Sequence, residues 1–255
     1  MVDQSNSFIL TKDEFKNFLK ILSRFSDACN DLHIIDGQVL QRSNDRGVAI
    51  RCDLSSLIKF DGEIILCDIK KIFGSLKGLD KNSPIRFIRV GNTICIKDTG
   101  SSIYTPIGNN VFIDNKYIPV AEFDKIFNYG QMILEGDINK DLSETLKKFA
   151  KITNSYNLIL SIKSQKAVLG YLKGSGQSIN TEFNFSYKLM SGMPDNEIKL
   201  PIIPFNFNSE CTLKVYFDQN NNRIALNVFT IPFSGNISIE IYSRSAIMTE
   251  AKEEE

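Results

Sequence analysis

The chain has 255 residues with 30 basic and 30 acidic side chains, so its formal net charge is zero. Apolar residues make up 42% and charged residues 24% of the sequence, which supports a packed core and excludes disordered, collagen-like and coiled-coil classes. No segment approaches the roughly 18 apolar residues of a membrane span, and no export signal is expected at the N-terminus. Zero net charge argues against nucleic-acid binding by overall charge, although basic side chains can still gather on one surface.

Motifs for catalysis and metal binding are missing from the sequence. The five cysteines, at positions 29, 52, 67, 95 and 211, form no CxxC pair and lie beside apolar residues, which predicts buried thiols in the cytoplasm or another reducing compartment. The single histidine, His33, lies in an apolar strand-like run and is predicted to be structural. Neither a Walker loop nor GxSxG, GxGxxG or HExxH occurs. The sequence therefore predicts no metal, no cofactor and no enzymatic activity.

The first predicted element is an amphipathic helix over residues 11–25. Thr11 can cap it, and Glu14 can complete a capping box. One face carries the apolar residues Phe15, Phe18, Leu19, Leu22 and Phe25. Strands are expected at 32–41 and 46–55, around the Asp36-Gly37 turn, and again at 63–67 and between 85 and 104. A shorter helix follows Asp68, with Ile69, Ile72, Phe73 and Leu76 predicted to point inward.

The second half repeats this order. A helix over 140–153 is expected to begin with Asp141 and Glu144 and to turn Leu142, Leu146, Phe149 and Ile152 inward. Strands are predicted at 157–171, 178–186 and between 213 and 242. The pattern predicts a duplicated α+β domain: residues 1–108, a connector at 109–122 that contains Pro119 and lacks a helical period, residues 123–249, and an acidic tail at 250–255.

Positive charge is concentrated on the predicted helices. Residues 11–25, 69–78 and 140–153 carry 11 basic and four acidic side chains, so the rest of the chain has a net charge of −7. Lysines often do no more than solvate a helix face. Recurrence of the basic face on both copies of the duplicated helix favours a binding surface instead.

The order and spacing of these segments resemble the DNA polymerase sliding clamps, of the two-domain type that closes as a trimer, with the tailed-phage members nearest. The resemblance rests on Phe18-Leu19-Lys20, Asp36-Gly37-Gln38, Ala49–Ser55, the helix at 68–78, Gly91–Ile96 and Ser102–Pro106. It implies a ring with antiparallel sheets outside and basic helices inside, through which duplex DNA passes. The implied function is to tether a replicative DNA polymerase and raise its processivity, without catalysis.

The resemblance also assigns residues to three surfaces. The DNA-binding positions are Lys12, Lys16, Lys20, Arg24, Lys70, Lys77, Lys140, Lys147, Lys148 and Lys151. The residues expected to form a pocket for partner peptides are Ile50, Phe112, Ile113, Tyr117, Ile118 and Tyr242. The subunit interface is expected to involve Ser102, Ile103, Tyr104, Ile179, Thr181, Phe183 and Phe185, on two strand edges that would pair head to tail.

The implied partners are double-stranded DNA without sequence preference, a DNA polymerase, a clamp loader and further copies of the chain as a homotrimer; no membrane partner is expected. The fourth clamp helix should lie near residues 203–209, which are short, contain Pro204 and lack a basic side chain. Two alternatives stay open. One is a monomeric two-domain polymerase accessory factor held on DNA by charge, and the other is an unrelated α+β interaction module or small-molecule enzyme with incidental basic helices.

Overall fold

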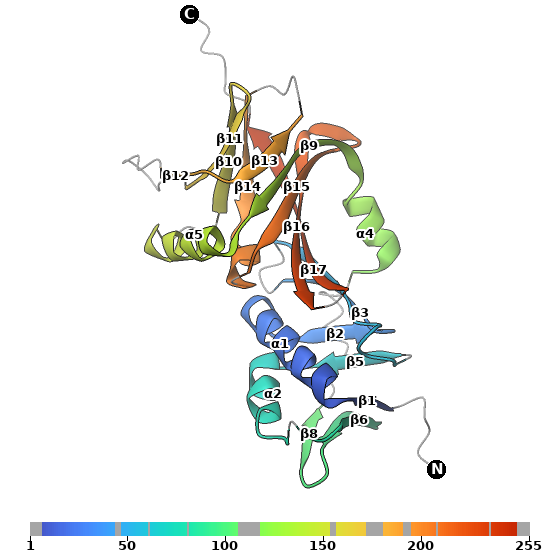
Figure 1. The fold of residues 1–255 in the computed structure, drawn as a ribbon. Coiled ribbons are helices and arrows are strands. Elements are labelled where there is room, and N and C mark those ends of the chain that lie inside the picture. Colours follow the sequence, from blue (N-terminus) through green and yellow to red (C-terminus); the bar gives the residue numbers. More distant parts are fainter. Residues whose placement is uncertain are drawn as a thin grey trace, which may run out of the picture. The chain divides into compact units, whose positions relative to one another are not determined.

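The computed structural model of the chain describes residues 7–43, 47–60, 62–80, 82–106, 118–153, 157–171, 181–190, 195–207, 209–234 and 236–248 (Figure 1). The chain forms two compact units. The N-terminal unit comprises residues 1–119 together with 233–239, and the C-terminal unit comprises 120–232 together with 240–255. In the part of the chain that the structure describes, no helix is long and apolar enough to span a membrane.

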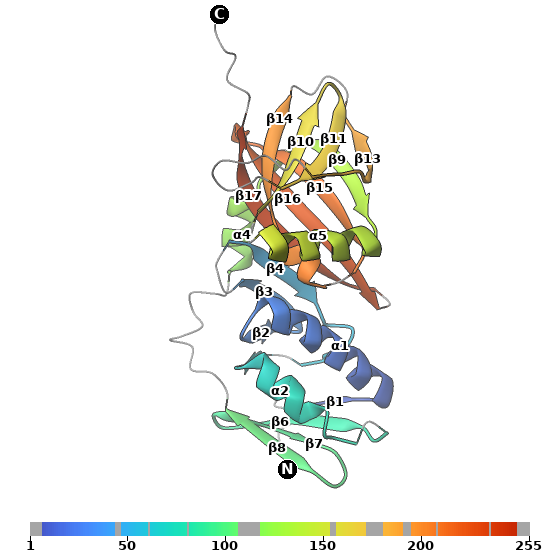
Figure 2. The ribbon, with the colours of Figure 1, turned by 90° about the vertical axis from the view of Figure 1, so that its left-hand side faces the viewer.

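Among its described residues, the N-terminal unit has two helices and two groups of four antiparallel strands. Its elements in chain order are β1 Ser7–Leu10, α1 Lys12–Ala28, β2 Leu32–Ile35, β3 Gln38–Arg42, β4 Ala49–Asp53, β5 Glu63–Leu66, α2 Ile69–Leu76, β6 Ile85–Val90, β7 Thr93–Lys97 and β8 Ser102–Pro106. One sheet has the order β1-β6-β7-β8, and the other has the order β5-β2-β3-β4. The helices α1 and α2 lie side by side (Figure 2).

Helix α1 begins as its sequence predicts. Thr11 accepts from the Glu14 amide and its own amide donates to the Glu14 carboxylate at 2.7 Å, which completes the capping box. The predicted apolar face is buried, and Phe18 meets Phe87 of β6 edge to face at 5.5 Å between ring centroids. Phe8 of β1 stacks on the same Phe87 ring at 4.5 Å, so α1 and the β1-β6-β7-β8 sheet share one aromatic core.

The C-terminal unit is built on a longer sheet. Its elements are α4 Val120–Ile126, β9 Tyr129–Ile138, α5 Lys140–Thr153, β10 Asn157–Lys163, β11 Lys166–Gly170, β12 Glu182–Phe183, β13 Ser186–Leu189, β14 Asn196–Pro201, the 3₁₀ helix η2 Ile203–Phe207, β15 Cys211–Asp218, β16 Asn221–Ser234 and β17 Ile237–Met248. The strand order is β12-β11-β10-β14-β17-β16-β15-β9-β13. The first and last strands of this order, β12 and β13, are separated by only two residues in the chain, so the two edges of the sheet lie close together.

Strand pairing confirms the predicted duplication. In the N-terminal unit the first strand precedes a long helix and pairs in the order β1-β6-β7-β8, and the C-terminal unit repeats this with β9, α5 and the order β9-β15-β16-β17. The remaining strands correspond as well, since β5-β2-β3-β4 matches β14-β10-β11-β12. The short η2 takes the chain position of α2, which agrees with the expectation that residues 203–209 depart from a full helix.

Three expectations for the second half were wrong in detail, although helix α5 begins as expected. Asp141 lies in its first turn, and Asn139 caps the helix by accepting from the Leu142 amide at 2.9 Å. Its buried positions are Ser143, Leu146 and Ala150, so the inward face is rotated toward small residues, and Ile152 is 77% exposed. Residues 178–180 of the strand expected at 178–186 lie outside the described residues, and the rest contains the short β12 and the first residue of β13. Helix α4 was not predicted from the sequence pattern.

Candidate nucleic-acid interface

The basic face of α1 lies where the amphipathic pattern predicts it. Lys12, Lys16 and Lys20 are exposed and Arg24 is half-buried, on the side away from the buried phenylalanines. Lys16 lies 3.6 Å from the Asp13 carboxylate, a contact between exposed groups that solvent screens strongly. The stripe therefore presents cationic groups that phosphate oxygens can reach.

Helix α2 adds a second basic stretch to the N-terminal unit. Asp68 caps the helix by accepting from the Lys71 amide at 3.2 Å, and both Lys70 and Lys77 are exposed. The Lys77 ammonium lies 4.1 Å from the centroid of the Phe73 ring, which is half-buried rather than fully inward as predicted. Lys71 is exposed too. It is missing from the predicted site because the family resemblance did not single it out, although its charge was visible in the sequence.

The basic residues of α5 do not all face solvent. Lys140, Lys148 and Lys151 are exposed, and Lys140 lies 3.9 Å from the Glu144 carboxylate. Lys147 was expected to point outward but is half-buried, and its Nζ donates to the carbonyl oxygen of Asn206 in η2 at 3.3 Å. The reason is that the inward face of α5 is rotated, which brings Lys147 toward the neighbouring 3₁₀ helix.

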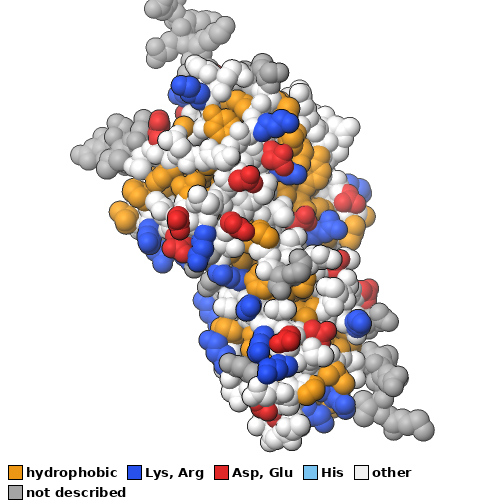
Figure 3. Space-filling view, viewed as in Figure 1, with side chains coloured by type: hydrophobic (Ala, Val, Ile, Leu, Met, Phe, Trp, Pro, Cys, Tyr) orange, Lys and Arg blue, Asp and Glu red, His pale blue; other side chains and the backbone are white. Residues whose placement is uncertain are grey.

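The N-terminal unit thus carries one group of basic side chains, on α1 and α2, and the C-terminal unit carries another, on α5 (Figure 3). Exposed ammonium groups on helix faces suit sequence-independent contacts to phosphates, which position a duplex without reading its bases. Among the described residues, no group of three or more His, Cys, Asp and Glu side chains could hold a metal ion.

The predicted pocket residues are buried where the structure describes them. Ile50 in β4 is fully buried, and the amide of Ile118, also buried, donates to the Leu40 carbonyl at 3.1 Å. Tyr242 in the C-terminal unit is buried against α4, with its ring centroid 4.7 Å from Phe123 and 5.2 Å from Phe127. The other three positions, Phe112, Ile113 and Tyr117, lie outside the described residues.

The predicted interface residues fall on two sheet edges. Within the described residues, β8 pairs only with β7 and β12 pairs only with β11. On β8, Ser102 and Tyr104 are exposed and Ile103 is half-buried. Ile179 lies outside the described residues.

The segment around β12 is held by aromatic contacts. Thr181, Phe183 and Phe185 are half-buried, and the Phe183 ring meets Phe149 of α5 edge to face at 5.1 Å between ring centroids. Phe185 tilts against Tyr187 at 5.2 Å. These contacts fix the exposed edge of β12 relative to the rest of its unit.

The single histidine and the five cysteines are the other side chains that the sequence singled out. The imidazole Nε2 of His33 lies 2.5 Å from a Glu63 carboxylate oxygen on the paired strand β5. All five cysteines are free thiols, and all are buried except the half-buried Cys67. Burial raises the pKa of the Cys211 thiol to about 12, with the Asp137 carboxylate adding to the increase, so this thiol stays protonated and unreactive near neutral pH.

Comparisons with known proteins identify the fold. No protein-family model matches the sequence, and no curated protein is significantly similar to it. Solved structures do match over nearly the whole chain. Proliferating Cellular Nuclear Antigen from Entamoeba histolytica superimposes with a TM-score of 0.66 at 9% identity, covering 94% of this chain and 98% of that one. A structure of the C-terminal region of FEN-1 bound to A. fulgidus PCNA gives 0.59 at 13% identity, with 97% and 100% covered.

A bacterial match extends the same result. A putative DNA polymerase III beta subunit from Eubacterium rectale superimposes with a TM-score of 0.61 at 15% identity, covering 97% of this chain and 67% of that one. None of these matches singles out a phage protein. Together with the duplicated pairing order and the helices that follow the first strand of each unit, they establish that this chain has the two-domain fold of the DNA sliding clamps.

Proposed function

We propose that the chain is a sliding clamp: a closed ring of identical subunits that encircles duplex DNA and holds a DNA polymerase on its template. The observation that carries the proposal is the placement of exposed lysines on α1, α2 and α5, in a chain with the clamp fold and zero net charge. A ring is retained on DNA by topology, so its inner face needs only weak, exchangeable phosphate contacts.

The two open strand edges support the ring. Unpaired edges are a liability in a free subunit because they can pair with other chains. Pairing of β8 from one copy with β12 from the next would cover both edges and would repeat around a closed ring. The homotrimer follows from the trimeric clamp type that the sequence resembles.

Partner binding is proposed to follow the clamp pattern, with polymerase and clamp loader inserting short peptides beside the connector. Ile50, Ile118 and Tyr242 are the described candidates for this pocket. Their burial means that a peptide would reach them only where neighbouring side chains shift. A few buried apolar anchors can dominate such a contact.

The test compares how well the chain is retained on circular and on linear duplex DNA. Chain loaded onto a nicked circular duplex is passed through a sizing column in high salt, before and after the circle is cut once. A clamp stays with the circle and leaves the linear product, because salt removes phosphate contacts but not the topological link. A monomeric accessory factor held by charge would leave both forms in high salt, and retention on the linear product equal to that on the circle would contradict a topological link.

A further inference from the structure

One face of the β1-β6-β7-β8 sheet points away from the helices of the N-terminal unit. Phe87 of β6 contacts Phe18 of α1, so side chains that share the face of Phe87 point toward the helices. Neighbouring side chains of a strand point to opposite faces, and residues paired across antiparallel strands share a face. The opposite face, called the outer face, therefore carries three rows of side chains. In strand order they are Ile9, Arg86, Lys97 and Ser102; Ser7, Ile88, Cys95 and Tyr104; and Val90, Thr93 and Pro106.

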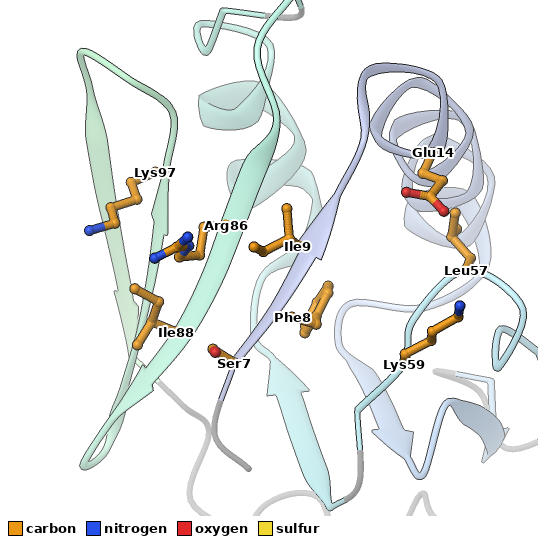
Figure 4. Close-up of a pocket in the computed structure, with 9 residues that line it drawn as sticks. All are labelled: Ser7, Phe8, Ile9, Glu14, Leu57, Lys59, Arg86, Ile88 and Lys97. Atoms are coloured by element: carbon orange, nitrogen blue, oxygen red, sulfur yellow. The ribbon is translucent and has the colours of Figure 1, made fainter. Parts of the chain in front are cut away.

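The outer face exposes a group of apolar side chains. Ile9, Val90 and Tyr104 are each more than half exposed, which few large apolar side chains of the described chain are. A hollow of about 670 Å³ runs beside them, and the outer-face residues in its lining are Ser7, Ile9, Arg86, Ile88 and Lys97 (Figure 4). Exposed apolar side chains that gather in this way mark a binding surface.

Positive charge lies on the same face, with no acidic side chain to balance it. Arg86 is directly opposite Lys97, and like charges in that position destabilise a sheet. Neither forms an ion pair with a described residue, and strands β1, β6, β7 and β8 contain no Asp or Glu. Asp98, which follows β7, accepts hydrogen bonds from three backbone amides instead. In the corresponding sheet of the C-terminal unit, by contrast, Lys214 lies opposite Glu135, 3.1 Å from its carboxylate. The outer face of the N-terminal sheet therefore favours a partner that supplies carboxylates.

The C-terminal unit shows what can cover such a face. Its corresponding sheet, β9-β15-β16-β17, has α5 on one side and α4 on the other (Figure 1). Tyr242 of β17 is only 4% exposed, because Phe123 of α4 and Phe127 directly after it pack against its ring. Tyr104 lies on β8, the strand that corresponds to β17, and is 69% exposed. Among the described residues of the N-terminal unit, no helical segment covers Tyr104 as α4 covers Tyr242.

We propose that the outer face of the β1-β6-β7-β8 sheet binds an amphipathic, acidic helix of a partner protein, in the way that α4 covers the corresponding sheet. Ile88 and Tyr104 share one row and lie two strands apart, which is about 10 Å. Two turns of a helix have this length, so a helix laid across the strands can place apolar residues at i, i+4 and i+7 on the row. Carboxylates along one side of that helix would meet Arg86 and Lys97 in the next row, about 7 Å away along the strands.

This surface goes beyond the proposed ring and is compatible with it. Pairing of β8 with a strand of another copy would use the backbone at the edge of β8, whereas the helix would contact side chains on its outer face. Aliphatic side chains at Ile9, Ile88 and Val90 dominate the apolar part of the face. They favour an apolar helix over single-stranded nucleic acid, whose bases stack on aromatic rings.

The experiment measures fluorescence anisotropy of a labelled helical peptide, titrated with the full chain. The peptide carries Phe or Leu at i, i+4 and i+7, Glu along one side and Ala elsewhere. We expect saturable binding that Tyr104→Thr weakens roughly tenfold, as for a central aromatic anchor. Arg86→Gln/Lys97→Gln should weaken it to a similar extent. A second peptide with Gln in place of Glu should not respond to that double substitution, because no charge pair remains to be lost. Lys166→Gln, which removes an exposed positive charge on β11, is the matched control and should leave the affinity unchanged.

The variants should fold normally, since Arg86 and Tyr104 are exposed and Lys97 is half-buried, and an unchanged melting temperature checks this. The proposal is wrong if the wild-type chain does not bind the acidic peptide, or if the variants bind it as well as Lys166→Gln does. It is also wrong if a labelled thymidine oligonucleotide, rather than the peptide, loses affinity in these variants, since the face would then bind single-stranded DNA. A lower particle mass in the variants with unchanged peptide binding would assign the face to contacts between copies and would contradict it too. Peptide binding needs only the folded chain, so the absence of a ring would leave the expected result unchanged.

Discussion

Lys147 on α5 donates a hydrogen bond to the carbonyl oxygen of Asn206 on η2, with 3.3 Å between Nζ and the oxygen. The adjacent Lys148 is exposed. Two consecutive lysines of α5 therefore have different environments. Substituting each one alone distinguishes the contribution of the Lys147 hydrogen bond to stability from the effect of removing a positive charge.

Replacement of Lys147 by Met should lower the free energy of unfolding by about 1 kcal/mol, because the Asn206 carbonyl loses a charged donor. Lys148→Met should leave it unchanged within about 0.5 kcal/mol, as expected for an exposed side chain. Urea unfolding followed by circular dichroism measures both. Equal effects of the two variants would show that the Lys147 hydrogen bond does not stabilise the unit.

Charge reversal of exposed lysines should weaken DNA interaction without affecting the fold. Lys20→Glu combined with Lys148→Glu should reduce the slope of log affinity against log salt by roughly one for each lysine that no longer neutralises a phosphate. Binding to a short duplex at several salt concentrations gives this slope. The control is Lys166→Glu, whose exposed charge lies on β11 rather than on a helix. An unchanged slope in the double variant would remove these lysines from the DNA surface.

Two glycines with positive φ allow a matched test of the β2–β3 turn. Gly37 has φ +76°, and a Cβ there would lie 2.9 Å from the Ser55 Cα, whereas Gly91 has φ +59° with no atom within 4 Å of its Cβ position. Gly91→Ala should cost about 1 kcal/mol for the left-handed backbone alone. Gly37→Ala should cost a further 1–3 kcal/mol or so, because the backbone of residue 55 must move. Thermal melting measures the loss of stability in each variant. Equal losses would mean that the backbone at Ser55 moves away from the added Cβ without a cost in free energy.

Cysteine reactivity should follow burial and thiol pKa. Because the pKa of Cys211 is raised to about 12, the folded chain holds this thiol protonated at pH 8, where the half-buried Cys67 should be alkylated faster. The stabilising preference for the neutral thiol is complete below the unfolded pKa of about 8.5 and is lost as pH rises toward 12. Mass spectrometry after timed iodoacetamide treatment measures each site. Modification of Cys211 as fast as Cys67 would contradict this.

The sequence predicted most reliably the elements whose signals are local. The Thr11 and Glu14 capping box and the apolar stripe of α1 need only a helical period to be read, and both are present. Helix α4 escaped prediction because its stability rests on Phe123 and Phe127 packing against Tyr242, far along the chain. For α5, the buried small residues Ser143 and Ala150 gave no hydrophobic signal, so the inward face was assigned to larger residues nearby.

The candidate surfaces also differ in whether a local sequence pattern could predict them. Exposed lysines follow directly from amphipathic patterning, and α1 bears this out. Among the described strands, the edges of β8 and β12 that carry no partner depend on which strands pair, which no local pattern specifies.

The pocket residues require a paired measurement of stability and partner binding. Ile50→Ala should cost about 2–5 kcal/mol, as expected for a fully buried side chain. Tyr242→Phe should keep the ring contacts with Phe123 and Phe127 and retain most of the stability. If Ile50 also anchors a partner, the milder Ile50→Val, which should cost only about 1 kcal/mol of stability, should also reduce affinity for a polymerase C-terminal peptide at a temperature where the variant is fully folded. Unchanged peptide affinity in that variant would leave Ile50 as core alone.

The most direct test of the proposed clamp is electron microscopy of the purified chain at micromolar concentration, with the particle mass measured in the same sample. The proposal predicts rings with a central hole wide enough for duplex DNA and a mass of three chains. Solid particles with the 28.8 kDa mass of a single chain would contradict it.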